Sequence, residues 1–295
     1  MVQSGVVRWR KWTLTPLLVA LAALLTLGMT GRTPPQSYVA LGDSYTAAPA
    51  NAVQDNNPPG CYRSDHNYPH LVAPNLNLPV FRDVSCSGAQ TKDMTSSQSV
   101  SPSPNPPPQF DALDSNTRAV SLTIGGNDIG FTEIIQNCIS PVNSGTPCQD
   151  KYVVNGDDQI SDRITATAPK VASVLQGIRS RSRHTKIFLL GYLDILPDTG
   201  VGCFPQMPVT DGDVPYLLDK EKQLNAMLKS VTVANHGVYV DTYTPSIGHD
   251  ACQAPTVRWV EPLAPVPPTY PVHPNQAGMN ADTDILLPVM HQNGF

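Results

Sequence analysis

The sequence predicts an α/β fold in which helices cover both faces of a parallel β-sheet. Short apolar runs that end in glycine or polar residues alternate with long segments of helical periodicity. Strands this apolar are typical of parallel sheets, which are buried on both faces. The chain has 295 residues, of which 40% are hydrophobic, so it can bury a full core. We therefore expect a single domain over residues 32–295.

The order of the elements follows from these patterns. The apolar, β-branched runs predict strands over residues 37–41, 80–85, 119–124, 186–191 and 238–241. Apolar side chains that share one helical face predict long helices over residues 160–180, which Pro169 interrupts, and 217–234. Two further helices are expected over residues 68–76, broken by Pro74, and 275–290. Segments rich in Pro, Gly, Ser and Asn predict loops over residues 51–69, 96–108 and 137–156.

The N-terminus has the pattern of a targeting segment. Arg8, Arg10 and Lys11 precede residues 12–29, which are 18 uncharged and mainly apolar residues, and small residues follow them. We predict that residues 1–31 are a signal peptide that is removed. A retained N-terminal membrane anchor is the alternative, because 18 residues are near the lower limit for a spanning helix. Either way the domain is expected outside the cytoplasm, secreted or anchored at the cell surface close to the membrane or cell wall.

Charge and cysteine content narrow the class of protein further. Residues 1–31 hold three basic and no acidic side chains, so 16 basic and 24 acidic residues remain beyond them, a net charge of −8. This charge argues against a nucleic-acid partner. An even number of cysteines on an exported chain predicts three disulfides among Cys61, Cys86, Cys138, Cys148, Cys203 and Cys252. Six cysteines allow about 15 pairings, of which closeness favours only Cys138 with Cys148. Because no C-x-x-C spacing and no histidine pair occurs, we expect no metal site.

Polar residues follow three of the predicted strands. Ser44 lies in Gly42-Asp43-Ser44 after the first, Gly88 follows the second, and Asn127 lies in Gly125-Gly126-Asn127-Asp128 after the third. The carboxyl ends of parallel strands meet at one edge of the sheet, where sites form. A serine hydroxyl there is a nucleophile if a base removes its proton. The Ser44 N–H, the Gly88 N–H and the Asn127 side chain are candidate donors to the oxyanion that an ester forms when attacked.

His273 is the candidate base among the seven histidines. It stands between Pro271 and Pro274, immediately before the last predicted helix. Prolines restrict the backbone on both sides of it, so a loop histidine held in this way can be aimed across a site. The other six histidines are expected to be structural or to lie on the surface.

Taken in this order, the Gly-Asp-Ser, Gly88, Gly-Gly-Asn-Asp and His273-Pro274 segments resemble the SGNH (GDSL-like) hydrolase family, from about residue 38 to about residue 282. The resemblance implies a three-layer α/β/α sandwich of the flavodoxin-like type. It also implies Ser44 as nucleophile, His273 as base, and Gly88 and Asn127 as oxyanion donors. The cysteines resemble those of secreted actinobacterial esterases and lipases in the family, which implies the pairs Cys61–Cys86, Cys138–Cys148 and Cys203–Cys252.

One position departs from the family pattern. Members usually carry an aspartate three residues before the histidine, where this chain has Tyr270, and no carboxylate occurs between Glu261 and His273. We expect the backbone carbonyl of Tyr270 to orient the imidazole instead. A carbonyl can select the tautomer, although it stabilises an imidazolium less than a carboxylate does. A remote acid such as Asp250 is the alternative.

These observations predict an exported serine esterase or lipase that hydrolyses carboxylic esters through an acyl-enzyme. We expect a small-molecule or lipid ester as substrate, no cofactor, no metal and a monomeric enzyme. The alternatives are a carbohydrate O-deacetylase, a phospholipase, and a non-catalytic cell-surface binding protein on the same fold, which the missing aspartate favours. A chymotrypsin-like protease is excluded because its serine would come last in the chain, and an α/β-hydrolase because no Gly-x-Ser-x-Gly occurs.

Overall fold

The computed structural model describes residues 1–7, 9, 34–264 and 269–295. The chain divides into Met1–Thr33 and Pro34–Phe295, and the fold is that of the second unit. The predicted signal peptide or anchor over residues 1–31 lies largely outside the described residues. In the part of the chain that the structure describes, no helix combines the length and apolar character needed to cross a membrane.

A five-stranded parallel sheet forms the centre of the domain, in the order β4-β1-β5-β8-β9. The strands are β1 (Ser37–Ala40), β4 (Val80–Asp83), β5 (Thr117–Leu122), β8 (Lys186–Leu190) and β9 (Val238–Val240). The chain leaves β1 for β4 on one side and then crosses to β5 on the other. The strand order therefore reverses at β1, and in such sheets ligands bind beyond the carboxyl ends of the strands at this point.

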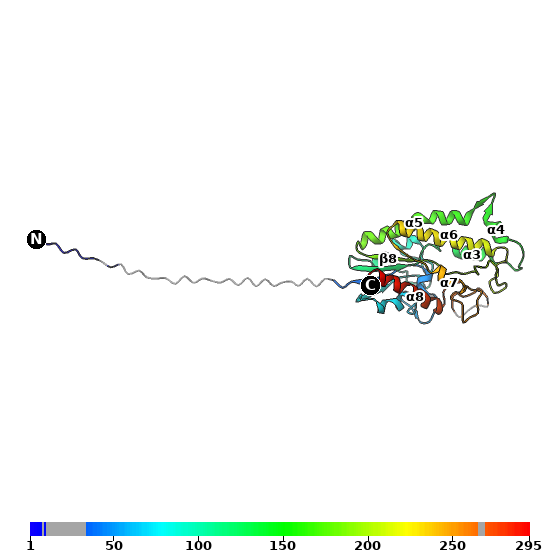
Figure 1. The fold of residues 1–295 in the computed structure, drawn as a ribbon, viewed down its shortest axis with the longest axis horizontal. Coiled ribbons are helices and arrows are strands. Elements are labelled where there is room, and N and C mark those ends of the chain that lie inside the picture. The colour runs from blue at the N-terminus through cyan, green and yellow to red at the C-terminus, as the bar shows by residue number, and fades with distance from the viewer. Residues whose placement is uncertain (8, 10–33, 265–268) are drawn as a thin grey trace. The chain divides into compact units, whose positions relative to one another are not determined.

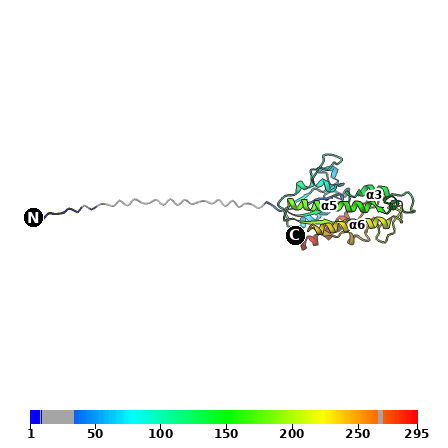
Figure 2. The same ribbon diagram turned by 90° about the horizontal axis from the view of Figure 1, so that it is seen from above.

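Helices cover both faces of this sheet (Figure 1). On one face α5 (Gln159–Arg181) and α6 (Val214–Ala234) pack side by side (Figure 2). On the other lie α2 (Tyr68–Val72) and α8 (Gln276–Gln292), which also contact each other. Successive strand residues point to opposite faces, so Val39 joins the core under α5 and α6, whereas Tyr38 joins the core under α2 and α8. The predicted three-layer α/β/α sandwich with a parallel sheet is confirmed.

All five predicted strands are present, with ends that differ by one or two residues. The two long predicted helices correspond to α5 and α6, and α8 matches the last one. Pro169 does not break α5, contrary to expectation. The side of α5 that carries Pro169 is exposed to solvent. Water can there hydrogen-bond the carbonyl four residues earlier, which proline deprives of its helical donor, while Val171 and Val174 on the opposite side stay buried.

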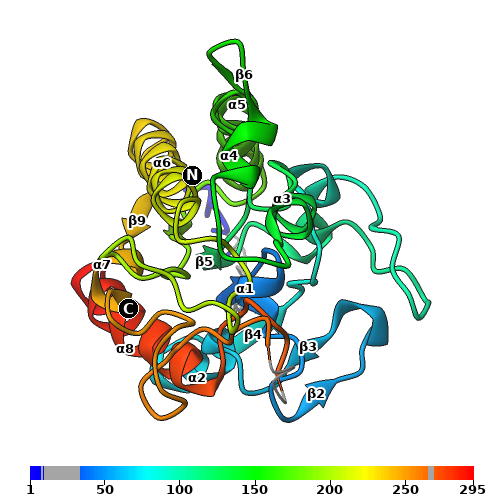
Figure 3. The same cartoon turned by 90° about the vertical axis from the view of Figure 1, so that its right-hand side faces the viewer.

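Besides four single-turn 3-10 helices among the described residues, the remaining helices and strands are short and lie in segments where the sequence predicted loops or no regular structure. They are α1 (Ser44–Ala47), α3 (Phe131–Cys138), α4 (Pro147–Tyr152), α7 (Tyr243–Ser246), and the strand pairs β2 (Gln54–Asp55) with β3 (Arg63–Ser64) and β6 (Val153–Val154) with β7 (Asp157–Asp158). Both strand pairs lie at the outer edge of the view in Figure 3. Helix α4 begins where the Asp213 carboxylate accepts the Cys148 and Gln149 N–H groups. This cap comes from far along the chain, so the local sequence does not reveal it.

Candidate active site

The turn after β1 carries Ser44. Asp43 caps helix α1, because its carboxylate accepts the Tyr45 N–H at 3.0 Å, and Ser44 is the first residue of that helix. Gly42 has φ +123°, and a Cβ there would lie 2.6 Å from the Thr123 carbonyl oxygen. Only glycine fits this close approach of the turn to the neighbouring strand. The turn that carries the candidate nucleophile Ser44 is therefore set directly against the end of β5.

His273 lies against Ser44, although 229 positions separate them in the chain. The imidazole Nε2 is 2.8 Å from Ser44 Oγ, and Nδ1 is 2.8 Å from the Pro271 carbonyl oxygen. Since a carbonyl can only accept, the proton is on Nδ1, and Nε2 is left to accept the Ser44 hydroxyl proton. Burial lowers the pKa of His273 from 6.5 to about 4, against the opposing effect of the Pro271 hydrogen bond. The imidazole is thus neutral at neutral pH, as a base must be.

We expected the Tyr270 carbonyl to accept the hydrogen bond from Nδ1. This prediction is wrong, because the acceptor is the Pro271 carbonyl. Val272 has φ +58°, so the chain turns back on itself and the carbonyl two positions before His273 faces the ring. The Tyr270 ring instead packs edge-on against the imidazole with centroids 5.0 Å apart. Asp250, the alternative, is bonded to the Cys252 N–H and the Gln253 amide. Among the described residues, no carboxylate is hydrogen-bonded to His273.

The three expected oxyanion donors lie in segments that the structure brings to this edge of the sheet. Neither the Ser44 N–H nor the Gly88 N–H donates a hydrogen bond to any described residue. Gly88 has φ +78°, in the left-handed region that favours glycine. The Asn127 amide donates one proton to the Ala89 carbonyl at 3.0 Å, which ties the Gly88 segment to the turn after β5. Its second N–H is left for a ligand.

A profile of the GDSL-like Lipase/Acylhydrolase family matches residues 40–281. The chain belongs to this family. A lipase of Streptomyces coelicolor, Lipase 2, is 38% identical over 282 residues, which cover 88% of this chain and 90% of that protein. An esterase of Streptomyces scabiei is 28% identical over 279 residues, 81% of each chain. This GDSL-like hydrolase is therefore an enzyme of the lipase and esterase class, rather than a non-catalytic binding protein.

Solved structures support the fold. Phospholipase A1 from Streptomyces albidoflavus superposes with a TM-score of 0.72 at 25% identity, over 88% of this chain and 99% of that one. An extracellular lipase from Streptomyces rimosus gives a TM-score of 0.71 at 24% identity, over 87% and 99%. The central parallel sheet with flanking helices is thus the sheet of this family's hydrolases.

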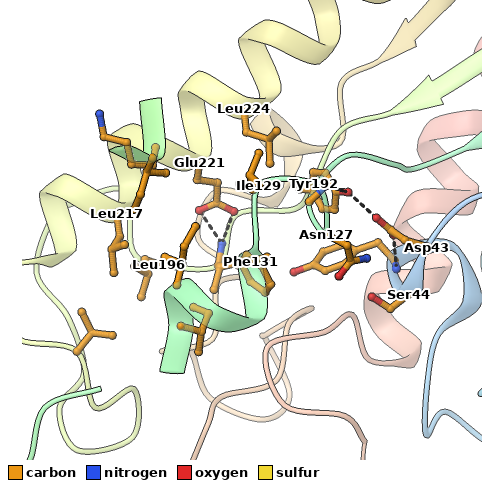
Figure 4. A pocket seen from close by; sticks show the side chains of 18 of the residues that line it. Asp43, Ser44, Asn127, Ile129, Phe131, Tyr192, Leu196, Leu217, Glu221 and Leu224 are labelled. Atoms are coloured by element: carbon orange, nitrogen blue, oxygen red, sulfur yellow. Dashed lines mark hydrogen bonds between the residues drawn. The ribbon is translucent and has the colours of Figure 1, made fainter. Parts of the chain in front are cut away.

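An apolar pocket of the GDSL-like hydrolase opens beside Ser44 and Asn127 (Figure 4). It holds about 810 Å³ of empty space, part of which is open to solvent. Its walls come from the segment after β5, from α3, from the loop after β8 and from α6. They include Ile129, Phe131, Leu196, Met207, Leu217 and Leu224. A lining of this kind suits an apolar group of a ligand.

Glu221 is the acidic side chain in the apolar part of this wall. The Ile195 N–H donates to both carboxyl oxygens of Glu221, at N···O distances of 3.2 and 3.4 Å (Figure 4). Burial, and then the nearby Asp194, raise the pKa of Glu221 well above its ordinary value. A neutral carboxyl is compatible with an apolar ligand beside it.

The loop that carries His273 is held by contacts that the sequence analysis missed. Val260 and Pro274 form an isolated antiparallel bridge, and Glu261 and His273 lie within this pairing. The Glu261 carboxylate accepts the Asn275 amide at 2.9 Å and the Arg258 guanidinium at 2.6 Å. No sequence motif marked these residues, because their roles follow from contacts between the two ends of the loop.

All three implied disulfides are present: Cys61–Cys86, Cys138–Cys148 and Cys203–Cys252. The first ties the segment that leads to Gly88 to the loop after β2. The third joins the loop after β8 to the loop after α7. Within the described ranges, no group of three or more His, Cys, Asp or Glu side chains is arranged to hold a metal ion.

Proposed function

We propose that this GDSL-like hydrolase is an exported serine esterase that cleaves carboxylic esters through a covalent acyl-enzyme. The observation that carries the proposal is the 2.8 Å contact between Ser44 Oγ and a His273 nitrogen whose other nitrogen donates to a backbone carbonyl. This arrangement supports a dyad in which His273 is the base and the Pro271 carbonyl selects its tautomer.

The reaction divides into two steps. His273 Nε2 accepts the Ser44 proton while Oγ attacks the ester carbonyl carbon, and the oxyanion is stabilised by the Ser44 and Gly88 N–H groups and the Asn127 amide. The imidazolium then donates its proton to the departing alcohol, which leaves the acyl group on Ser44. In the second step water, deprotonated by His273, attacks that acyl group, and the acid leaves as Ser44 regains its proton.

The substrate class that the pocket supports best is an ester with an apolar acyl chain. Large apolar side chains from several segments line the pocket next to Ser44, many more than the single methyl of an acetyl group could contact, which disfavours a carbohydrate O-deacetylase. A phospholipid is the second candidate, because a structural relative at 25% identity is a phospholipase A1. Export is supported by the three disulfides, which persist in oxidising compartments.

Hydrolysis of p-nitrophenyl esters from acetate to palmitate by oxidised protein tests the proposal. We expect Ser44→Ala to lower kcat by about 10⁴-fold or more, and activity to rise from acetate to longer acyl chains. Ser173→Ala, on the exposed side of α5, is the matched control and should leave activity unchanged. Equal activity of Ser44→Ala and the unmodified enzyme would exclude Ser44 as the nucleophile. Release of fatty acid from phosphatidylcholine micelles tests the phospholipid candidate in parallel.

A further inference from the structure

Two buried tyrosines lie between the segments that carry the candidate catalytic groups. Tyr45 follows Ser44 directly, and Tyr192 lies just after β8. They are 3% and 6% exposed, and their rings meet edge to face with centroids 4.9 Å apart. Tyr192 lies outside the motifs that indicated the family, and Tyr45 directly follows the Gly-Asp-Ser segment.

The Tyr192 hydroxyl joins the nucleophile turn to the turn after β5. It donates to Asp43 Oδ2 at 2.6 Å (Figure 4) and accepts the Gly126 N–H at 2.7 Å. The other Asp43 oxygen accepts the Tyr45 N–H, so one carboxylate and one hydroxyl connect the residues next to Ser44 and next to Asn127. Burial raises the pKa of Asp43 to about 7, and the Tyr192 hydrogen bond opposes this rise.

Gly126 gives independent support for this contact. A Cβ on Gly126 would lie 2.8 Å from the Tyr192 hydroxyl oxygen. Gly126 is not among the glycines with positive φ, so its backbone does not require glycine. The close approach of the Tyr192 hydroxyl, and of the ring carbon that bears it at 3.0 Å from the same Cβ, therefore accounts for glycine at this position.

The Tyr45 hydroxyl joins the nucleophile turn to the loop that carries the base. It donates to the Val272 carbonyl oxygen at 3.0 Å. Val272 has φ +58°, which is a genuine outlier for a β-branched residue and persists only where its surroundings hold it. This strained residue comes directly before His273, so the Tyr45 bond holds the backbone that aims the imidazole.

We propose that Tyr45 and Tyr192 are positioning residues of the ester hydrolase: Tyr192 sets Ser44 against Asn127, and Tyr45 sets Ser44 against His273. This inference rests on the proposed function. Groups that react together need placement to within about 0.5 Å, and here they come from three segments far apart in the chain. A displacement near 1 Å costs about 100-fold in rate.

Tyr192→Phe and Tyr45→Phe test the inference, because each removes one hydroxyl and keeps the ring. We expect each to lower kcat for p-nitrophenyl butyrate by about 10- to 100-fold with KM changed less than about threefold. Tyr38→Phe is the matched control. Tyr38 is 1% exposed, and the substitution removes its 2.6 Å hydrogen bond to Ser121. Tyr38 lies in the core on the other face of the sheet, away from the candidate site. It should lose stability with kcat within about twofold of the unmodified enzyme.

A second measurement distinguishes a loss of transition-state stabilisation from a general loosening of the fold. A trifluoromethyl ketone adds to Ser44 and places an oxyanion in the site, so its inhibition constant should rise about 10- to 100-fold in Tyr192→Phe.

A double-mutant cycle tests the contact between Tyr192 and Gly126. The effects of Tyr192→Phe and Gly126→Ala on kcat should be non-additive, so that the double variant loses less activity than the product of the two single losses. The inference is overturned if Tyr192→Phe and Tyr45→Phe keep kcat within twofold, if Tyr38→Phe loses as much as they do, or if the cycle is additive. Activity in Ser44→Ala would instead overturn the proposed function.

Discussion

The two halves of the candidate site are supported in different ways. Ser44 and Asn127 follow strands β1 and β5 within a few residues, at the centre of a sheet that is buried on both faces. His273 is carried by a loop between α7 and α8 in which the described residues form only the isolated Val260–Pro274 bridge. The position of Ser44 and Asn127 is set by the core, whereas the position of His273 depends on a few hydrogen bonds. Substitutions in the loop should therefore displace His273 more, and lower activity more, than comparable substitutions beside the sheet displace Ser44.

Asn127→Ala probes the sheet-supported half, and its expected effect is larger than that of any change in the contacts that support the loop. Removing one oxyanion donor should lower kcat by about 100- to 1000-fold with little change in KM. Steady-state kinetics on p-nitrophenyl butyrate measure this. Asn280→Ala, on an exposed position of α8, is the control. A decrease of less than threefold would remove Asn127 from the oxyanion site.

Glu261→Ala probes the loop-supported half. The substitution removes the acceptor for Asn275 and the ion-pair partner of the largely buried Arg258. We expect it to lower the free energy of unfolding by about 3 kcal/mol and kcat by about tenfold. Denaturant unfolding and kinetics measure the two effects. Glu133→Ala breaks the ion pair of a carboxylate that is 55% exposed, so both quantities should stay nearly unchanged. Full kcat in a destabilised Glu261→Ala variant would show that the base does not depend on this loop contact.

The pKa of His273 sharpens the comparison further. Since burial lowers it from 6.5 to about 4, folding favours the neutral ring, and the resulting stability is present above about pH 6.5 and lost as the pH falls toward 4. The His273 Cε1–H resonance, identified by its absence in His273→Ala, should keep the chemical shift of a neutral ring from pH 8 down to pH 5. A midpoint near pH 6.5 in this NMR titration would mean that the loop leaves His273 open to water.

Glu221 in the pocket wall has the smallest expected effect. Its raised pKa means that increasing pH introduces a charge beside the acyl chain. The ratio of kcat/KM for p-nitrophenyl decanoate to that for the acetate should therefore fall a few-fold as pH rises, and stay constant in Glu221→Gln. The amide is the matched control because it keeps an acceptor for the Ile195 N–H. The same pH dependence in both proteins would assign it to another group.

The sequence predicted the sheet-supported half of the site better than the loop. Strands such as residues 119–124 are apolar, β-branched and ended by glycine, so local pattern determines them, and the motif residues Ser44 and Asn127 follow them directly. His273 stood out through its two prolines. The carbonyl beside it was placed one residue too early, because the left-handed backbone at Val272 is not encoded by any local preference of valine.

The contacts that escaped prediction are long-range. Tyr192 meets Asp43 across 149 positions, and Tyr45 meets Val272 across 227. Helix α4 lies in a segment of loop-like composition because a carboxylate from the start of α6 caps it. Such contacts depend on how the strands and loops come together, which the periodicity of a single segment does not contain.

Trapping Ser44 with a fluorophosphonate tests the dyad most directly. Intact-protein and peptide mass spectrometry of the oxidised enzyme should find a single label on Ser44. The second-order labelling rate should fall by about 10³-fold or more in His273→Ala, since no other base contacts Ser44 Oγ among the described residues. A label on another residue, or labelling of His273→Ala at the unmodified rate, would contradict a Ser44–His273 dyad oriented by the Pro271 carbonyl.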